Sequence, residues 1–81
     1  MSYTVYVIRN SLTGKLYKGQ TEHLEKRLTE HNQGHTKTTR GEGIWSVVYS
    51  EVFETRQEAL KREKYFKSAA GRRFLKKVLS A

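Results

Sequence analysis

The side chains of this sequence best suited to chemistry are two tyrosines, an arginine, a histidine and one isolated glutamate. Tyr6 and Tyr17 lie in short strand-like stretches, and Arg27 and His31 follow one turn apart in a basic helical segment. Glu63 comes much later, at a helical position where an apolar residue is expected. Phenols, a guanidinium, an imidazole and a carboxylate are the groups that one-metal hydrolysis of a phosphodiester requires. They can act together only if the fold brings them to one place.

The two tyrosines are expected to lie in a β-hairpin. Residues 3–9 and 15–19 are rich in β-branched and aromatic residues, and residues 10–14 have turn composition. Taken singly, each tyrosine is an ordinary half-buried strand residue. An unperturbed phenol has a pKa of about 10, so it is a poor base at neutral pH unless nearby cations such as Arg27 or a metal ion lower that pKa.

The register of this hairpin decides whether the tyrosines share a face. A four-residue loop pairs Arg9 with Gly14 and places Tyr6 opposite Tyr17. A five-residue loop pairs Arg9 with Lys15 and puts the two phenols on opposite faces, because a one-residue slip inverts a strand. A joint role for the phenols therefore requires the first register, or a bulge that restores it.

A helix is expected to follow, with Thr21 as its N-cap and Gly34 just beyond its end. The helical period places four residues on one face: Leu24, Arg27, Leu28 and His31. The leucines should dock on the sheet and leave Arg27 and His31 at the edge of the buried face. An arginine fork and an imidazole suit a phosphate there, but the same pair would also serve as the polar rim of an amphipathic helix.

The remaining segments predict a loop, a strand and two helices. Residues 35–43 are polar and typical of a surface loop, and residues 44–53 have strand composition. One face of that strand should carry Trp45, Val47, Tyr49 and Phe53. The order β-β-α-β-α-α indicates an α+β fold with a three-stranded, mainly antiparallel sheet flanked by helices. We expect one domain over residues 1–81.

The first of these two helices should begin at a capping box over residues 55–58. Its apolar stripe is expected to comprise Ala59, Leu60, Phe66, Ala69 and Ala70. Gly71 should interrupt this helix, and residues 72–79 should form a short final one. Its inward face is expected to carry Phe74, Leu75, Val78 and Leu79, and its outward face Arg72, Arg73, Lys76 and Lys77.

Glu63 is the exception within the apolar stripe. It lies three residues after Leu60 and three before Phe66. A carboxylate facing the protein is costly unless it is paired or bound to a metal ion. Two interpretations stay open. Glu63 is a structural residue, in a helical ion pair with Lys67 one turn later or with its charge at the edge of the stripe, or it is a metal ligand.

The charge balance indicates a polyanionic partner. Sixteen Lys and Arg face eight Asp and Glu, for a net charge of +8, which favours nucleic acid over an acidic membrane surface. There is no cysteine, so disulfides and thiolate zinc sites are excluded. Because no leader or long apolar run is present, we expect a cytoplasmic protein. Cations expected to contact nucleic acid are Lys18, Lys37, Arg40, Lys67, Arg72 and Arg73.

Taken together, these residues resemble the GIY-YIG nuclease family over nearly the whole chain. Thr4-Val5-Tyr6 stands in place of its Gly-Ile-Tyr motif and Tyr17-Lys18-Gly19 in place of its Tyr-Ile-Gly motif, with Thr4 and Lys18 as departures. Arg27 and His31 match the family's helix arginine and the histidine one turn later, and Glu63 matches its metal-binding glutamate. The small size resembles the stand-alone, single-domain bacterial members.

This resemblance implies a metal-dependent DNA endonuclease, with a role in DNA repair or recombination. Tyr6 and Tyr17 would position or deprotonate the attacking water, and Arg27 would hold the scissile phosphate. His31 would bond a tyrosine or help it lose its proton. Glu63 would hold one divalent ion, Mg²⁺ or Mn²⁺, and no small-molecule cofactor is expected. The alternatives are a catalytically inactive nucleic-acid-binding module of the same fold and a basic accessory protein.

Overall fold

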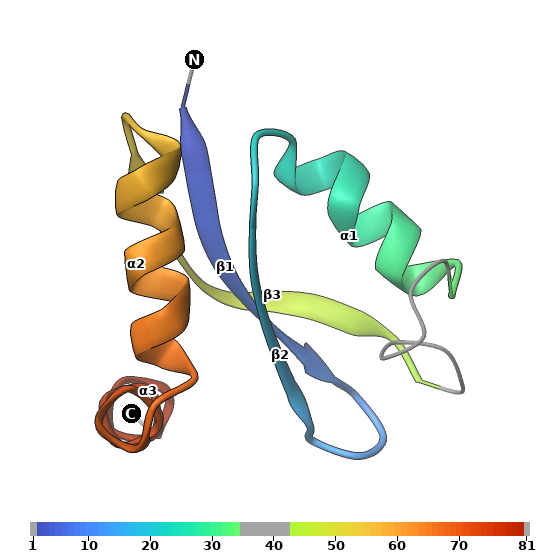
Figure 1. Ribbon diagram of the computed structural model, residues 1–81. Helices are drawn as coiled ribbons and strands as arrows, with labels where there is room; N and C mark the ends of the chain where they lie inside the picture. The colour runs from blue at the N-terminus through green and yellow to red at the C-terminus, as the bar shows by residue number, and fades with distance from the viewer. Residues whose placement is uncertain (1, 35–42, 81) are drawn as a thin grey trace.

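A three-stranded antiparallel sheet, with helices on both faces, forms the frame of the computed structural model (Figure 1). The structure describes residues 2–34 and 43–80, so most of the expected 35–43 loop lies outside it. The sheet has the order β2-β1-β3. Its elements are β1 (Tyr3–Asn10), β2 (Leu16–Thr21), α1 (Leu24–Asn32), β3 (Trp45–Phe53), α2 (Arg56–Phe66) and α3 (Ala69–Leu79). The predicted α+β class and element order are confirmed.

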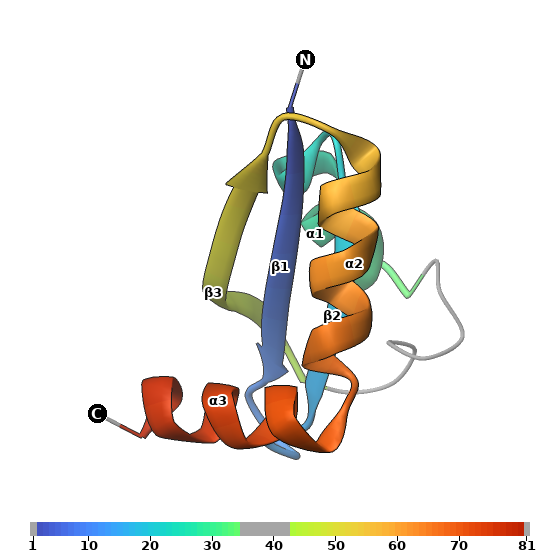
Figure 2. The same cartoon turned by 60° about the vertical axis from the view of Figure 1, so that its left-hand side comes forward.

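The central strand β1 is buried on both faces. Its side chains alternate, as the pleat requires: Val5 and Val7 face one way, Tyr6 and Ile8 the other, and all four are at most 1 % exposed. Figures 1 and 2 show why, because α1 and α2 lie on opposite sides of the sheet. In Figure 2, α3 runs crosswise below α2 at the hairpin end of the sheet.

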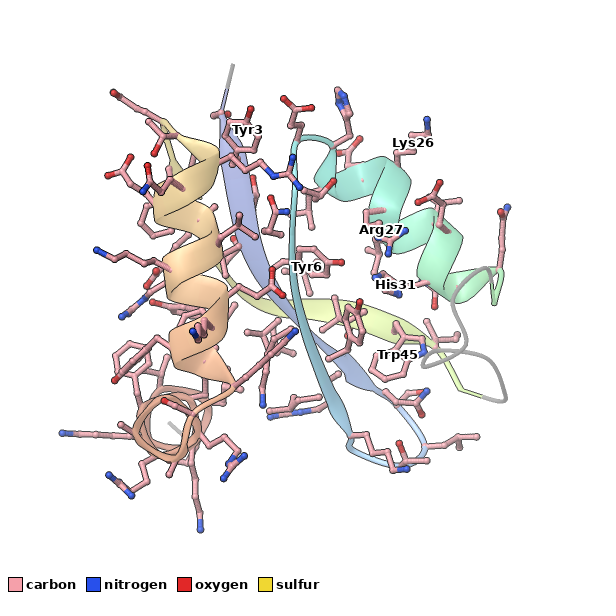
Figure 3. All side chains as sticks on the ribbon, viewed as in Figure 1. Tyr3, Tyr6, Lys26, Arg27, His31 and Trp45 are labelled. Atoms are coloured by element: carbon pink, nitrogen blue, oxygen red, sulfur yellow. The ribbon has the colours of Figure 1, made fainter. Side chains whose placement is uncertain are left out.

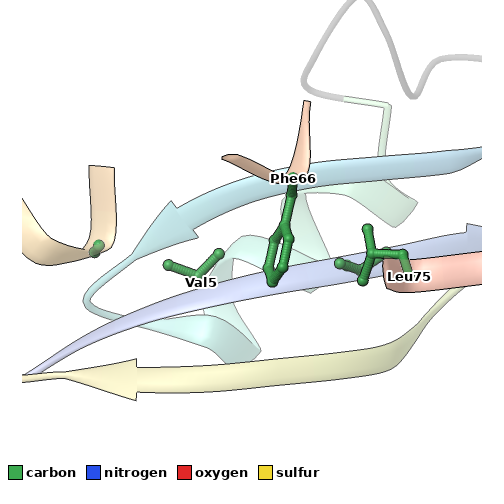
Figure 4. Packing of buried hydrophobic residues seen from close by; sticks show 5 residues of the cluster. Val5, Phe66 and Leu75 are labelled. Atoms are coloured by element: carbon green, nitrogen blue, oxygen red, sulfur yellow. The ribbon is translucent and has the colours of Figure 1, made fainter. Parts of the chain in front are cut away.

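Two hydrophobic clusters result, one on each face. On the α2–α3 face, Val5 and Val7 pack with Ala59, Phe66 and Leu75 (Figure 4). On the α1 face the buried members are Tyr6, Ile8 and Trp45, with Tyr17, Leu24 and Leu28 packed against them. Burying each large apolar side chain contributes roughly 1.5–3 kcal/mol. The leucines of α1 thus dock on the sheet as predicted, beside Tyr6.

A β-bulge in β3 overturns the prediction that one face carries Trp45, Val47, Tyr49 and Phe53. Val7 pairs with Tyr49 but Ile8 with Val47, so Val48 is an extra residue. A bulge of one residue reverses the side-chain alternation. Trp45 therefore packs beside Tyr6 on the α1 face, whereas Tyr49 and Phe53 pack on the α2–α3 face.

The start of α1 also differs from expectation. Thr21 is the last residue of β2 rather than the N-cap, and its hydroxyl accepts a hydrogen bond from the His23 amide at 3.1 Å. His23 is the N-cap and makes no side-chain capping bond. The end is as predicted: Gly34 adopts φ 74°, the left-handed conformation that favours glycine.

The boundary between α2 and α3 lies earlier than predicted. The Thr55 hydroxyl caps α2 through the Glu58 amide, as expected. However, α2 ends at Phe66, and Ser68 caps α3 by accepting from the Gly71 amide at 3.1 Å. Because serine is a strong N-cap, it starts a new helix here. Ala69 and Ala70 are therefore exposed residues of α3.

Two predicted inward residues are in fact exposed. Leu60 of α2 is 44 % exposed and Val78 of α3 is 37 % exposed. The buried stripe of α2 instead runs through Ala59, Glu63 and Phe66, with Glu63 partly covered. Among the described ranges, no helix combines the length and apolarity needed to cross a membrane.

An ion pair links α2 to β3. Arg62 donates to both carboxylate oxygens of Glu51, at 2.8 and 3.1 Å, and the Tyr49 hydroxyl donates to Glu51 at 2.6 Å. The Arg62 guanidinium also lies over the rings of Tyr65 and Phe66, 4.8 Å from each centroid. Burial raises the pKa of Glu51, but the bonds from Arg62 and Tyr49 outweigh it and hold that pKa below its usual value.

We expect Glu51→Gln to lower the free energy of unfolding at pH 7 by about 1–2 kcal/mol. The pKa of Glu51 is lower in the folded state than in the unfolded state. The carboxylate therefore contributes fully to the free energy of unfolding above the unfolded pKa of about 4.3, and this contribution is lost as the pH falls through the folded-state pKa. Urea denaturation should therefore separate wild type and variant at pH 7, and the difference should shrink below about pH 4. Glu54→Gln, an exposed control, should change little at either pH; a pH-independent difference would contradict the assignment.

Candidate active site

The hairpin brings Tyr6 and Tyr17 to one face by a register that neither loop length predicted. Arg9 pairs with Leu16, so Tyr6 lies opposite Gly19 and Tyr17 opposite Ile8. This register differs by two residues from the one that would place the phenols opposite each other, and a two-residue shift preserves the face. The two rings lie diagonally, with centroids 6.3 Å apart. The prediction that a shared face requires Tyr6 to lie directly opposite Tyr17, or a bulge, was therefore wrong.

His31 of α1 lies against both tyrosines. Its Nε2 is 2.9 Å from the Tyr6 hydroxyl oxygen, and its ring centroid is 4.6 Å from that of Tyr17. The imidazole is fully buried. Burial and the neighbouring charge of Arg27 lower the pKa of His31, so the ring is neutral at pH 7. A neutral imidazole can accept the Tyr6 proton at Nε2 when its own proton is on Nδ1.

Arg27 completes the group on the α1 side. Figure 3 shows the Tyr6 hydroxyl end pointing toward α1, where Arg27 and His31 lie. The pKa of Arg27 is raised, first by its interaction with the Tyr6 hydroxyl and also by Glu30 and Tyr17. Its Nη1 donates to Glu30 at 3.1 Å, and about a third of the side chain is exposed. A phosphate can therefore reach the guanidinium from solvent.

The Tyr6 phenol is a weaker acid than expected. Burial raises the pKa of Tyr6 to about 12, against the opposing effect of Arg27, and the charges of Tyr17 and Glu63 add to the rise. Arg27 lowers this pKa, as expected, but desolvation by burial is the larger effect and the net shift is upward. Forming tyrosinate at pH 7 would cost about 7 kcal/mol, so Tyr6 is protonated at rest.

We expect absorbance titration to reveal one tyrosine with a pKa of about 12. Tyr6→Phe should remove this transition and leave the remaining tyrosine absorbance change in place. Tyr3→Phe, the same substitution on the other face of β1, should leave the transition near 12 in place. Loss of that transition in Tyr3→Phe would contradict the assignment.

Glu63 occupies the α2 side of the site. Its carboxylate is 2.8 Å from the Lys67 ammonium, and its side chain is 20 % exposed. The helical ion pair, one of the two interpretations of Glu63, is therefore present. The charge of Glu63 also acts on the Tyr6 phenol. The carboxylate thus lies within electrostatic range of the tyrosine face.

The donor set around Glu63 is compatible with a hard divalent ion. Within residues 2–34 and 43–80, no three His, Asp or Glu side chains converge on one point. Mg²⁺ does not need such a cage, because it commonly binds one or two carboxylates and keeps water and phosphate oxygens as its other ligands. In the structure the cation on Glu63 is the Lys67 ammonium.

Three residues that sequence reasoning gave no role also shape the site. A Cβ on Gly19 would lie 2.7 Å from the Tyr6 hydroxyl, so only glycine leaves room for the phenol. Glu30 holds Arg27. Asn32 binds the backbone of Trp45 through both amide atoms, at 2.7 and 3.0 Å, and so ties the end of α1 to β3. The place of Gly19 in the Tyr17-Lys18-Gly19 motif could have indicated its role. Nothing in the sequence near Asn32 indicates its hydrogen bonds to Trp45.

The residues expected to contact nucleic acid do not all lie together. Lys18 and Arg72 line a cavity of about 320 Å³ between the hairpin and α3, and Lys67 lies on Glu63. Arg73 is exposed on α3 and does not line that cavity. Lys37 and Arg40 fall outside the described residues.

The chain is similar to a known catalytic domain and to several known proteins. Residues 2–77 match the model of the GIY-YIG catalytic domain. A UPF0213 protein of Clostridium perfringens is 46 % identical over 68 residues, 83 % of this chain and 71 % of the relative. One of Staphylococcus saprophyticus is 36 % identical, covering 91 % of this chain and 90 % of the relative. The solution NMR structure of a UPF0213 protein from Bacillus halodurans has a TM-score of 0.59 at 28 % identity, covering 96 % of this chain and 85 % of that one.

Proposed function

Because the chain belongs to the GIY-YIG nuclease family, we propose that it is a metal-dependent endonuclease that hydrolyses DNA phosphodiester bonds. The observation that carries the proposal is the 2.9 Å contact between the Tyr6 hydroxyl and a buried, neutral His31. It gives a phenol a proton acceptor, in a site that also contains Arg27 and Glu63. A buried phenol needs a hydrogen-bond partner in any case; here that partner is a group able to accept its proton at neutral pH.

Tyr6 and His31 would act as a relay. A water bound at the Tyr6 oxygen gives up a proton to that oxygen as the Tyr6 proton passes to His31 Nε2. Because the two transfers occur together, free tyrosinate, which would cost about 7 kcal/mol at pH 7, does not accumulate. The water oxygen then bonds to phosphorus, and the bond to the leaving oxygen breaks. Tyr17, whose ring packs on His31, holds the imidazole in place and lines the water position.

Arg27 and Glu63 would manage the charge of the phosphate. The Arg27 fork binds the non-bridging oxygens and stabilises the negative charge that builds on them. Glu63 would hold a divalent ion, Mg²⁺ or Mn²⁺, which when bound supplies a Lewis acid for the leaving oxygen. Binding that ion requires Lys67 to leave the carboxylate.

The test is cleavage of supercoiled plasmid and of branched and nicked oligonucleotides, with Mg²⁺ or Mn²⁺ and with EDTA. Branched and nicked DNA are included because they represent substrates of repair and recombination. We expect metal-dependent nicking by the wild type and a loss of about 10²-fold or more in Glu63→Ala. Glu54→Ala, which removes an exposed carboxylate just before α2, should behave like wild type. Salt-sensitive binding without metal-dependent cleavage of any substrate would instead identify a nucleic-acid-binding module.

A further inference from the structure

Lys67 connects the proposed site to a second group of cations. Its ammonium lies 2.8 Å from Glu63, but more than half of its side chain is exposed. Such a partly exposed pair is weak, contributing at most about 1 kcal/mol. Its long, flexible stem can therefore leave Glu63 at little cost when a stronger ligand competes for either partner.

The second group lies directly beside Lys67. Arg72 Nη1 donates to the Lys67 carbonyl oxygen at 3.3 Å, and Lys18 lines the same cavity as Arg72. The other charged residues of that cavity are Arg9 and Lys76, and its described lining contains no carboxylate. Burial lowers the pKa of Lys18, and the charges of Arg72 and Lys67 lower it further. Lys18 and Arg72 thus share one cavity, and Arg72 contacts the backbone of Lys67. Glu63 is the carboxylate that pairs with this group, through Lys67.

We propose that Lys18, Lys67 and Arg72 form a binding site for a backbone phosphate other than the one held by Arg27, and that the Glu63–Lys67 ion pair keeps this site incomplete until a divalent cation takes Glu63. The inference rests on the proposed function, because it assumes a nucleic-acid substrate and an ion on Glu63. Lys18 and Arg72 line a cavity whose described lining contains no carboxylate, and Lys67 would join them once Glu63 is taken by the cation. Clustered cations of this kind are the chemistry that recognises a phosphate.

The ion pair couples the two ligands. A cation on Glu63 releases the Lys67 ammonium toward Lys18 and Arg72, so the phosphate binds more tightly. By linkage, a phosphate that attracts Lys67 frees Glu63 and strengthens cation binding by the same factor. Because the pair is partly exposed and contributes at most about 1 kcal/mol, this factor should be modest, about two- to fivefold.

The coupling can be measured without any metal. In EDTA at low salt, the affinity for a fluorescein-labelled DNA duplex is measured by anisotropy. Glu63→Gln frees Lys67, so it should bind the duplex about two- to fivefold more tightly than wild type. It should also steepen the slope of log K against log salt by about 0.9, because one more phosphate is neutralised. Glu25→Gln removes the same charge from an exposed position on α1 and should leave the slope unchanged.

A double-mutant cycle assigns the effect to Lys67. In a Lys67→Met background, Glu63→Gln should gain no more affinity than Glu25→Gln does. Arg72→Gln should weaken binding and reduce the salt slope, which tests the site through a second member. The proposal is overturned if Glu63→Gln and Glu25→Gln behave alike, or if the gain persists without Lys67.

This outcome is separable from that of the proposed function. If the cycle shows coupling between Glu63 and Lys67 but the protein cleaves no substrate, the proposed nuclease activity is wrong and the phosphate site stands. If the protein nicks DNA with metal but the effects of Glu63→Gln and Lys67→Met on DNA binding simply add, the phosphate site alone is wrong.

Discussion

Replacing Gly71 with alanine is expected to lower the free energy of unfolding by about 3 kcal/mol or more. A Cβ at this position would overlap the Tyr65 carbonyl oxygen and lie 2.6 Å from the Phe66 Cα. Both are backbone atoms, so neither can rotate away. Helix α3 would have to move off the end of α2 and uncover Leu75, which is 1 % exposed. Small domains have only about 5–15 kcal/mol of stability in total.

The direction of this effect distinguishes packing from helix propensity. Gly71 lies in the first turn of α3, and propensity alone would make alanine stabilising by up to about 1 kcal/mol. Urea denaturation of both proteins measures the difference. Ala70→Ser, an exposed change in the same turn, should cost less than about 0.7 kcal/mol. A Gly71→Ala protein as stable as wild type would show that α3 does not pack as closely on α2.

Replacing Tyr6 with phenylalanine is expected to reduce metal-dependent nicking by about 10²- to 10⁴-fold. The substitution removes one oxygen, and with it both the acceptor of the water proton and the donor to His31 Nε2. The buried imidazole nitrogen would lose its Tyr6 partner, so a stability loss of about 1–3 kcal/mol should accompany the loss of activity. Initial rates on plasmid, measured well below the melting temperature of the variant, separate the two effects.

Tyr3→Phe provides the matched control on the same strand. Tyr3 packs on the α2–α3 face, away from His31, so its nicking rate should equal that of wild type. Tyr17→Phe should have an intermediate effect, because Tyr17 contacts His31 through its ring. If Tyr6→Phe cleaves at the wild-type rate, Tyr6 is not the proton acceptor and the relay is wrong.

Local sequence patterns determined the elements and the inventory of the site. The β-branched and aromatic composition of residues 3–9 predicted β1. The capping box at Thr55 and the left-handed Gly34 marked helix ends because each depends on residues within one turn. The period of α1 placed Arg27 and His31 on one face. These features were predictable because their causes lie within a few residues. The prediction that both lie at the edge of the buried face is wrong for His31, which is fully buried.

Tertiary structure alone decided the register, the faces of β3 and the acidity of the phenol. The Asn10 side chain accepts from the amides of Leu12 and Thr13 and closes a longer turn than composition indicated. The bulge at Val48 depends on how β3 meets β1 across more than thirty residues. The pKa of Tyr6 depends on burial by α1 and on the distances to Arg27 and Glu63. Desolvation and charge interactions sum over neighbours that are remote in sequence, so the residue types could be predicted but the sign of the pKa shift could not.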